Sequence, residues 1–177
     1  RQGGLPVSDQ SVPTGESIQF KIIGLIRSPF KSPQNVPIQP AGAKGIKGRV
    51  ILKKEYQAGL KDLAGFSHII LIYYFHLIQD FSLIVKPYMD KYPHGIFATR
   101  APKRPNPIGL SIVRLLGIQD NILEIEDVDI VDNTPLLDIK PYVPEFDQRE
   151  KIEIGWLTTK IHQLKKTKDD GRFIKKK

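Results

Sequence analysis

The chain has 177 residues and a formal net charge of +8, with 40% hydrophobic and 26% charged residues. This length and composition predict one globular domain with a hydrophobic core of its own. The absence of cysteine excludes disulfides and thiolate metal sites, and no apolar run approaches the roughly 18 residues of a membrane span.

The positive charge is concentrated near the C-terminal end. From Lys160 to Lys177 there are eight Lys or Arg against Asp169 and Asp170, so this tail carries +6 and the rest of the chain +2. Such a tail favours a polyanionic partner, above all nucleic acid, although a solubilising, frayed terminus has the same composition. Residues 1–17 lack the apolar stretch of a signal peptide and are expected to form a flexible lead-in.

The first half of the chain is predicted to form short strands separated by irregular segments. Phe20 to Arg27 and Arg49 to Lys53 are expected to be strands, followed by one or two helical turns from Glu55 to Leu60. The intervening Ser28 to Gly48 contains four prolines and three glycines, and loops of this length are more often functional than accidental. Ser67 to His76 is continuously apolar and aromatic, which predicts a central strand of the core.

The second half is predicted to continue as strands and to end in a helix. A hairpin is expected where Ile108 to Ile118 and Ile122 to Ile125 flank a polar turn. Two further apolar runs, 128–131 and 136–139, lie on either side of the sequence DNTP. Lys151 to Lys166 has apolar residues at spacings of three and four, which predicts a C-terminal helix.

Together these elements predict a mainly β fold, an antiparallel β-barrel with a few short helices and a C-terminal helix. The glycine-rich stretch 42–48 neither follows a strand nor opens a helix, and it lacks the Walker A pattern. A glycine-rich hairpin entry is therefore favoured over a phosphate loop, and a Rossmann-type fold is not expected. The barrel domain is expected to cover residues 18–147, with the helix and basic tail in residues 148–177.

Two clusters of titratable residues require interpretation. His68 and His76 are eight residues apart and would share one face of a regular strand, but a metal site needs further ligands and none is expected. Four aspartates lie between Asp127 and Asp138. They are either turn and cap carboxylates or a polar rim that accepts hydrogen bonds from a ligand's amine and hydroxyls, and the sequence leaves both interpretations open.

The segment from His94 to Gly109, HGIFATRAPKRPNPIG, carries the strongest functional signal. Three prolines fix φ and remove backbone donors, and Asn106 is locked between two of them. The result is a stiff, extended, cationic loop, and rigid charged loops are common places for binding and catalysis. We therefore interpret its basic side chains as ligand contacts: Arg100, Lys103 and Arg104.

Four blocks of sequence extend this interpretation. IRSPF, GLKDLAGFSHIILIYYFH, FATRAPKRPNPIGLSIV and DIVDNTPLLDIKPYVP, in that order over Ile22 to Pro144, resemble the TrmO/TsaA-like family. The resemblance implies a cytoplasmic, homodimeric β-barrel enzyme that uses S-adenosylmethionine to methylate tRNA. The implied acceptor is the N6 nitrogen of threonylcarbamoyladenosine, the modified base just 3′ of the anticodon. In place of the C-terminal domain of longer bacterial members, only a helix and a Lys-rich tail are expected here.

The resemblance also implies the positions that hold the cofactor. Asn133 stands where family members commonly have Gly, a change that the turn tolerates because Asn adopts positive φ more readily than most residues. Leu77 replaces a Gln of bacterial relatives, so its expected contact is made by the backbone. The complete expected cofactor site is Gln39, His76, Leu77, Arg100, Leu110, Asn133, Thr134, Pro135 and Leu136.

Asn106 and Arg104 are the expected catalytic residues. The acceptor nitrogen carries a proton that has to leave, and our hypothesis is that Asn106 or a backbone carbonyl of the Arg-Pro-Asn-Pro loop accepts a hydrogen bond from it. Lys103 or Arg104 is expected to hold the threonyl carboxylate. These two residues, with Lys165 and Lys166 of the tail, are expected to contact tRNA. A non-catalytic RNA-binding barrel and an S-adenosylmethionine-binding regulatory dimer are the alternatives.

Overall fold

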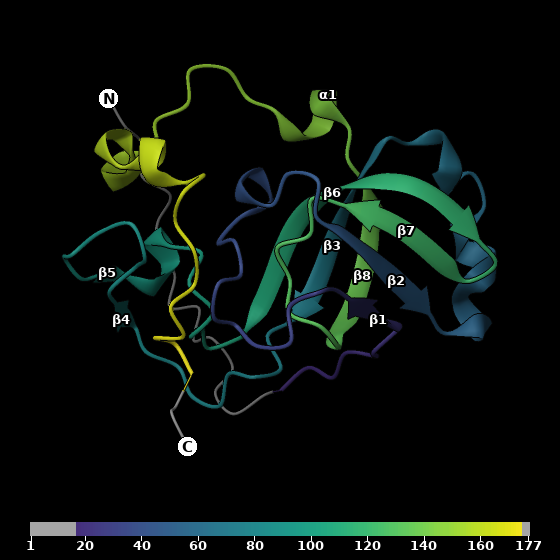
Figure 1. Ribbon diagram of the computed structural model, residues 1–177, viewed down its shortest axis with the longest axis horizontal. Helices are drawn as coiled ribbons and strands as arrows, with labels where there is room; N and C mark the ends of the chain where they lie inside the picture. Colours follow the sequence, from purple (N-terminus) through teal and green to yellow (C-terminus); the bar gives the residue numbers. More distant parts are fainter. Residues whose placement is uncertain (1–16, 175–177) are drawn as a thin grey trace, which may run out of the picture.

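Six strands close into an antiparallel barrel in the order β1-β2-β7-β6-β3-β8 (Figure 1). The computed structural model describes residues 17–174, so the predicted lead-in lies almost entirely outside the described part. The mainly β fold and the antiparallel barrel that the sequence predicts are confirmed. The barrel strands are β1 (Gly24–Arg27), β2 (Lys47–Leu52), β3 (His68–Tyr74), β6 (Ile108–Gln119), β7 (Ile122–Glu126) and β8 (Thr134–Pro141).

The core lies inside the barrel because alternate residues of each strand face inward. In β3, for example, Ile69, Leu71 and Tyr73 are buried while their neighbours are more accessible. The predicted strand at 128–131 is not formed. Val128 and Ile130 are buried against the barrel core instead, in an irregular segment between β7 and β8.

The predicted hairpin is confirmed, with β6 and β7 joined at Asp120 and Asn121. Asp120 has a φ of 54°, a left-handed conformation that Asp adopts more readily than most residues. The first strand begins four residues later than predicted, at Gly24. A Cβ at Gly24 would lie 2.5 Å from the Ile51 carbonyl oxygen, so the glycine permits a close approach of β1 and β2.

The regular helix predicted over Lys151 to Lys166 is replaced by two short 3-10 helices, η5 (Gly155–Thr159) and η6 (Ile161–Gln163). Gly155 has a φ of 55°, in the left-handed region, and therefore interrupts a right-handed helix at that point. Within residues 17–174 the single α-helix is α1 (Pro144–Asp147).

The remaining elements are short and surround the barrel. The helical turn predicted from Glu55 is present as the 3-10 helix η2 (Lys54–Leu60), and two strands form a separate small sheet beside the barrel (Figure 1). Within residues 17–174 no helix has the length and apolar character that crossing a bilayer requires. The other short elements are η1 (Pro40–Gly42), η3 (Leu63–Gly65), β4 (Ile84–Val85), β5 (His94–Gly95) and η4 (Ile96–Ala98).

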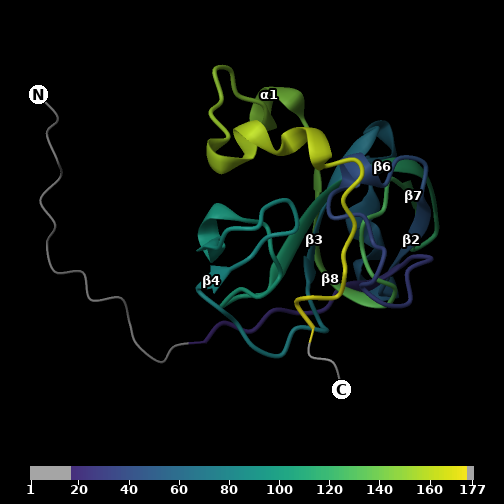
Figure 2. The same ribbon diagram turned by 60° about the vertical axis from the view of Figure 1, so that its left-hand side comes forward.

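The C-terminal segment returns to the barrel (Figure 2). Lys168 forms an isolated β-bridge with Pro37 of the proline-rich loop. The backbone of Asp169 extends this pairing, since its N–H donates to the Val36 carbonyl and its carbonyl accepts from the Asn35 N–H, both at 2.8 Å. Residues 168 and 169 are thus hydrogen-bonded to a loop that lies more than a hundred residues earlier in the chain.

Candidate functional site

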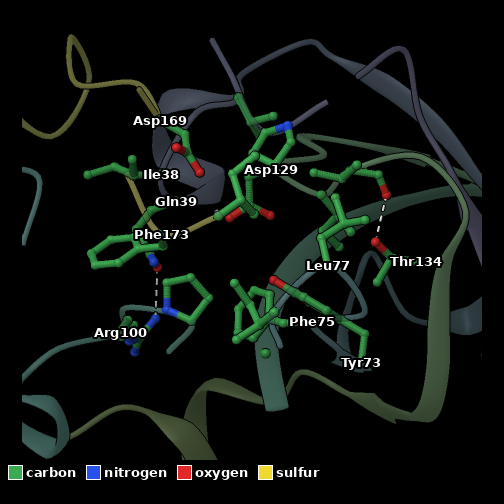
Figure 3. A pocket seen from close by; sticks show the side chains of 18 of the residues that line it. Ile38, Gln39, Tyr73, Phe75, Leu77, Arg100, Asp129, Thr134, Asp169 and Phe173 are labelled. Atoms are coloured by element: carbon green, nitrogen blue, oxygen red, sulfur yellow. Dashed lines mark hydrogen bonds between the residues drawn. The ribbon is translucent and has the colours of Figure 1, made fainter. Parts of the chain in front are cut away.

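A pocket of about 330 Å³ opens on the side of the barrel (Figure 3). Its walls come from the proline-rich loop, the end of β3, the stiff cationic loop with the start of β6, the turn before β8, and the C-terminal segment. Small-molecule sites typically measure roughly 300–1,000 Å³ and join an apolar lining to a few polar groups. The fold therefore brings four separately predicted segments to one ligand-sized cavity.

An aromatic pair forms one part of the lining. The rings of Tyr73 and Phe75 meet edge to face with centroids 5.4 Å apart. Gly109 lies opposite Tyr73 in the β3–β6 register, and a Cβ at this glycine would lie 2.2 Å from the tyrosine ring. Gly109, the last residue of the sequence PNPIG, is therefore required, because the Tyr73 ring occupies the space that a side chain would need.

Behind this pair, a chain of hydrogen bonds leads to Asp129. The Ser111 hydroxyl donates to the Asp129 carboxylate at 2.7 Å and lies 3.0 Å from the Tyr73 hydroxyl. Asp129 is reached from the pocket but is otherwise enclosed by protein, and this desolvation raises its pKa to about 7 despite the Ser111 hydrogen bond and the charge of Arg100. Burial is also the main reason why the pKa of Tyr73 is raised. Asp129 is thus a carboxyl group able to exchange a proton near neutral pH.

Arg100 connects the cationic loop to the proline-rich loop. Its guanidinium Nη1 donates to the Gln39 Oε1 at 2.9 Å, across the pocket edge (Figure 3). Arg104 stiffens the cationic loop, since its Nη1 donates to the carbonyl oxygens of Ile96 and Thr99 at 3.0 and 2.9 Å. Both arginines line the pocket and give it positive charge opposite the Asp129 carboxylate.

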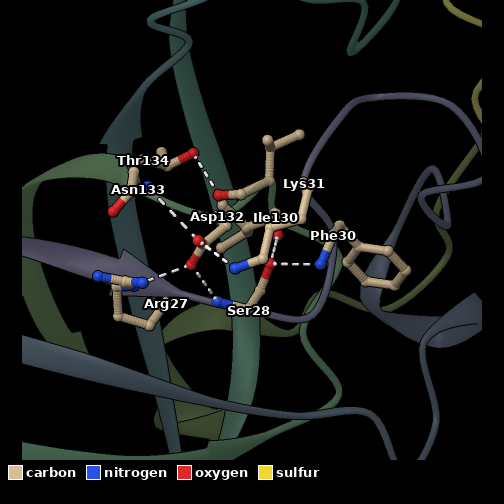
Figure 4. Close-up of polar contacts among 9 residues, drawn as sticks. Arg27, Ser28, Phe30, Lys31, Ile130, Asp132, Asn133 and Thr134 are labelled. Carbon is tan, nitrogen blue, oxygen red and sulfur yellow. Dashed lines mark hydrogen bonds and ion pairs between the residues drawn. The ribbon is translucent and has the colours of Figure 1, made fainter.

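Asp132 fixes the turn that forms the far edge of the pocket (Figure 4). Its buried carboxylate accepts from Lys31 Nζ at 2.6 Å, the Ser28 N–H at 3.0 Å and Arg27 Nε at 2.9 Å. Burial alone would raise its pKa, but these three donors lower it to about 2. The turn continues to Thr134, whose hydroxyl donates to the Val131 carbonyl at 2.7 Å. Asp132 therefore has the structural role that the sequence left open, whereas Asp129 faces the pocket.

The structure brings to the pocket six of the nine cofactor positions expected from the resemblance, together with Arg104. His76 lies two residues beyond the end of β3, not at the strand end as predicted, and burial lowers its pKa. Asn133 has a φ of 62°, the positive value that the sequence analysis anticipated. The expected residues that line the pocket are Gln39, His76, Leu77, Arg100, Arg104, Leu110 and Thr134.

The other expected positions lie elsewhere in the structure. Asn106 is exposed on the loop, and Lys103 forms an ion pair with Asp80 at 2.9 Å. Leu136 is fully buried in the barrel core. Outside the residues that line the pocket are Lys103, Asn106, Asn133, Pro135, Leu136, Lys165 and Lys166.

Several lining residues had no functional signal in the sequence. Tyr73 and Phe75 belong to an apolar strand that was interpreted only as core, although two aromatics at alternate positions before His76 share one face of the strand. Asp169 and Phe173 lie in a tail that was interpreted only by its charge. Among residues 17–174 no group of three or more His, Asp or Glu side chains is arranged to hold a metal ion.

An antiparallel barrel with a side pocket that carries both guanidinium and carboxylate groups defines a ligand-binding β-barrel, distinct from Rossmann-type nucleotide domains. The family model that matches is the tRNA-methyltransferase O N-terminal domain, over residues 25–148. The chain belongs to this family, as the sequence blocks predict.

Relatives and solved structures support this assignment. A probable S-adenosyl-L-methionine-binding protein of Pyrococcus abyssi is 60% identical over 89% of this chain and 85% of its own length. The tRNA (adenine(37)-N6)-methyltransferase of Escherichia coli is 39% identical over 72% of this chain, which spans 59% of that enzyme. The crystal structure of TrmO from Pseudomonas aeruginosa matches with a TM-score of 0.67 and 35% identity, over 80% of this chain and 63% of that one.

Proposed function

We propose that this chain transfers a methyl group from S-adenosylmethionine to the N6 nitrogen of threonylcarbamoyladenosine, next to the anticodon of tRNA. One observation carries the proposal: the proline-rich loop, the end of β3, the cationic loop and the DNTP turn, which hold the expected cofactor positions, all line the same pocket. The names of the relatives agree with this activity and cofactor.

The pocket has the donors and acceptors that this cofactor needs. S-adenosylmethionine carries two cationic groups, a carboxylate and an adenosine, and when bound it supplies an electrophilic methyl group. Arg100 offers a guanidinium for a carboxylate, and Asp129 offers an acceptor for hydroxyls or cations. Tyr73, Phe75 and Leu77 provide apolar surface for a purine or a methylene chain. Holding both reactants in line and excluding water is the main contribution that such a pocket can make.

The reaction requires a place for one proton. A nitrogen–carbon bond forms as the sulfur–methyl bond breaks, and the proton on N6 must leave. We propose that Asp129 accepts it, because this carboxylate faces the pocket and has a pKa of about 7. Asn106, the hydrogen-bond acceptor expected from the sequence, remains a proposal as well.

We also propose which residues bind tRNA, where the enzyme works and in which oligomeric state. Lys165 and Lys166 are exposed beside η6, where they would meet tRNA phosphates, and Arg104 at the pocket would hold the threonyl carboxylate. The enzyme would work in the cytoplasm, where tRNA is used, and as a homodimer. Exposed apolar side chains such as Phe20, at 62% exposure, offer contact surface for a second copy.

A label-transfer assay tests the function. The enzyme is incubated with S-adenosylmethionine labelled in the methyl group and with tRNA from cells that make, or cannot make, threonylcarbamoyladenosine. The proposal predicts label only in the first tRNA. Cofactor binding without transfer would favour the regulatory dimer, and tRNA binding without any cofactor affinity would favour the non-catalytic RNA-binding barrel.

A further inference from the structure

The C-terminal segment 168–174 forms one wall of the pocket although it lies beyond residue 148, where the match to the family model ends. We propose that this segment is a working part of the ligand site, in which the Asp169 carboxylate receives a cationic group of the bound ligand. This inference rests on the proposed function, since it takes S-adenosylmethionine as the ligand. It adds an acidic residue to the site and gives the tail a role that its positive charge does not suggest.

Two anchors hold the segment in place. At its start, the backbone of Asp169 pairs with residues 35 and 36 of the proline-rich loop. At its end, Phe173 is 7% exposed and packs with Val85, Ile96 and Ala101 in a small core separate from the barrel. A segment with hydrogen bonds at one end and a buried aromatic ring at the other is a fixed wall, not a frayed terminus.

The turn between the anchors sets the position of the carboxylate. The Gly171 N–H donates to the Asp169 Oδ1 at 2.6 Å, and Gly171 has a φ of 79°. A Cβ at this glycine would lie 2.6 Å from Gln34 Nε2, which is the end of a flexible side chain, so the positive φ is the reason that glycine is favoured here. Asp169 therefore belongs to a specific tight turn and faces the cavity beside Phe173 (Figure 3).

The surroundings of Asp169 leave its charge available to a ligand. Burial raises its pKa, which indicates that its negative charge is poorly solvated. Arg172, whose charge lowers the pKa of Asp169, is itself bound to Asp170 at 2.5 Å and to the Pro87 carbonyl at 3.1 Å. The buried Tyr88 hydroxyl, also at the pocket, lies beside Asp169, and its hydrogen bonding lowers the pKa of that carboxyl in opposition to burial. A desolvated carboxylate with a tyrosine hydroxyl as its neighbour favours a cationic, hydrogen-bonding ligand group.

Calorimetric titration of the full chain tests this inference. The ligands are S-adenosylmethionine, S-adenosylhomocysteine, which retains the ammonium but lacks the sulfonium charge, and methylthioadenosine, which lacks both. Asp169→Asn keeps the acceptor for the Gly171 N–H and removes only the charge. Asp138→Asn is the control, because this aspartate pairs with Lys140 at 2.8 Å and lies outside the pocket lining.

We expect Asp169→Asn to weaken S-adenosylmethionine binding at least fivefold and to leave methylthioadenosine binding unchanged. If Asp169→Asn weakens S-adenosylhomocysteine binding by the same factor, the ammonium is the recognised group. If S-adenosylhomocysteine binding is unchanged, the sulfonium is the recognised group. The inference is overturned if Asp169→Asn binds all three ligands as Asp138→Asn does, or if methylthioadenosine binding falls equally. If the wild type binds none of the ligands, the proposed function itself fails, which is a different result.

Tryptic digestion provides a second readout for the wall itself. Saturating S-adenosylhomocysteine should slow cleavage after Lys168 and Arg172 several-fold in the wild type. Phe173→Ala removes the buried anchor and should abolish that protection. Cleavage at an unchanged rate with the ligand bound to the wild type would contradict a role for this segment in the site.

Discussion

The Ser111 hydroxyl donates a 2.7 Å hydrogen bond to the Asp129 carboxylate, which leaves its oxygen free to accept from the Tyr73 hydroxyl at 3.0 Å. The three side chains come from β6, the segment before β8, and β3, so the network links both barrel strands of the pocket to its acidic residue. The direction of the bonds matters because an ionised carboxylate only accepts. Asp129 is thus oriented before any ligand arrives.

Asp129→Asn should lower the single-turnover methylation rate about 100-fold or more, the typical contribution of a positioned proton acceptor. Since the pKa of Asp129 is about 7 and the ionised form accepts the proton, the wild-type rate should rise as pH increases through 7. The variant should lose this rise. Rates measured from pH 5.5 to 8.5, with cofactor and tRNA saturating, provide the check.

Two comparisons sharpen that result. Asn106→Ala tests the acceptor expected from sequence, and a loss as large as that of Asp129→Asn, with the pH profile retained, would transfer the role to Asn106. Asp138→Asn is the control, because this aspartate pairs with Lys140 at 2.8 Å and lies outside the pocket lining. It should keep the wild-type rate and profile.

Gly109→Ala should disrupt the pocket, because the new methyl group would overlap the buried Tyr73 ring. We expect a loss of about 1–3 kcal/mol in the free energy of unfolding, typical of overpacking, and cofactor binding at least tenfold weaker. Gly117→Ala is the matched control on the same strand, since nothing lies within 4 Å of a Cβ there. Urea unfolding and calorimetry check both, and equal effects at the two glycines would contradict the role given to Tyr73.

Asp132→Asn should destabilise the fold by about 2 kcal/mol at pH 7, since hydrogen bonds to a charged group contribute roughly 1.5–3 kcal/mol. The pKa of Asp132 is lowered to about 2, so its stabilisation is complete above pH 4 and is lost as pH falls from about 4 towards 2. Wild type and variant should therefore differ less at pH 3 than at pH 7 in urea unfolding. A difference independent of pH would show that charge is not the cause. Asp120→Asn, in the exposed hairpin turn, should change little.

Neutralising Lys165 and Lys166 together should weaken tRNA binding and reduce its salt dependence, with the slope of log K against log salt falling by roughly two. Deleting the tail is unsuitable for this purpose, since residues 168–174 line the pocket. Replacing Lys53 and Lys54, exposed at η2, with alanine provides the control. If both double variants change the slope equally, Lys165 and Lys166 contribute no more to tRNA binding than other exposed lysines.

Much of this structure follows from patterns within short stretches of sequence. The hairpin between β6 and β7 was predictable because a polar turn separates two apolar strands, and the stiffness of the cationic loop follows from its prolines. Gly155 shows the limit of such patterns, since apolar spacing predicted a helix that the left-handed backbone at this glycine interrupts.

The pocket required knowledge of contacts between distant segments. Asp129 and Asp132 lie three residues apart and looked equivalent, yet one faces the pocket and the other is buried under Arg27 and Lys31. The place of Asp169 in the pocket could not be predicted from the basic tail, because its backbone pairing with the proline-rich loop has no local sequence pattern. The segments that the resemblance indicates border the pocket, but only the fold decides which of their side chains line it.

The most direct test of the central claim is to identify the product nucleoside. After incubation of threonylcarbamoylated tRNA with the enzyme and S-adenosylmethionine, the tRNA is digested and its nucleosides are analysed by tandem mass spectrometry. We predict threonylcarbamoyladenosine carrying one additional methyl group on N6, with the unmodified adenosine of control tRNA unchanged. Methyl groups on another base, or on unmodified adenosine to the same extent, would contradict the proposed reaction.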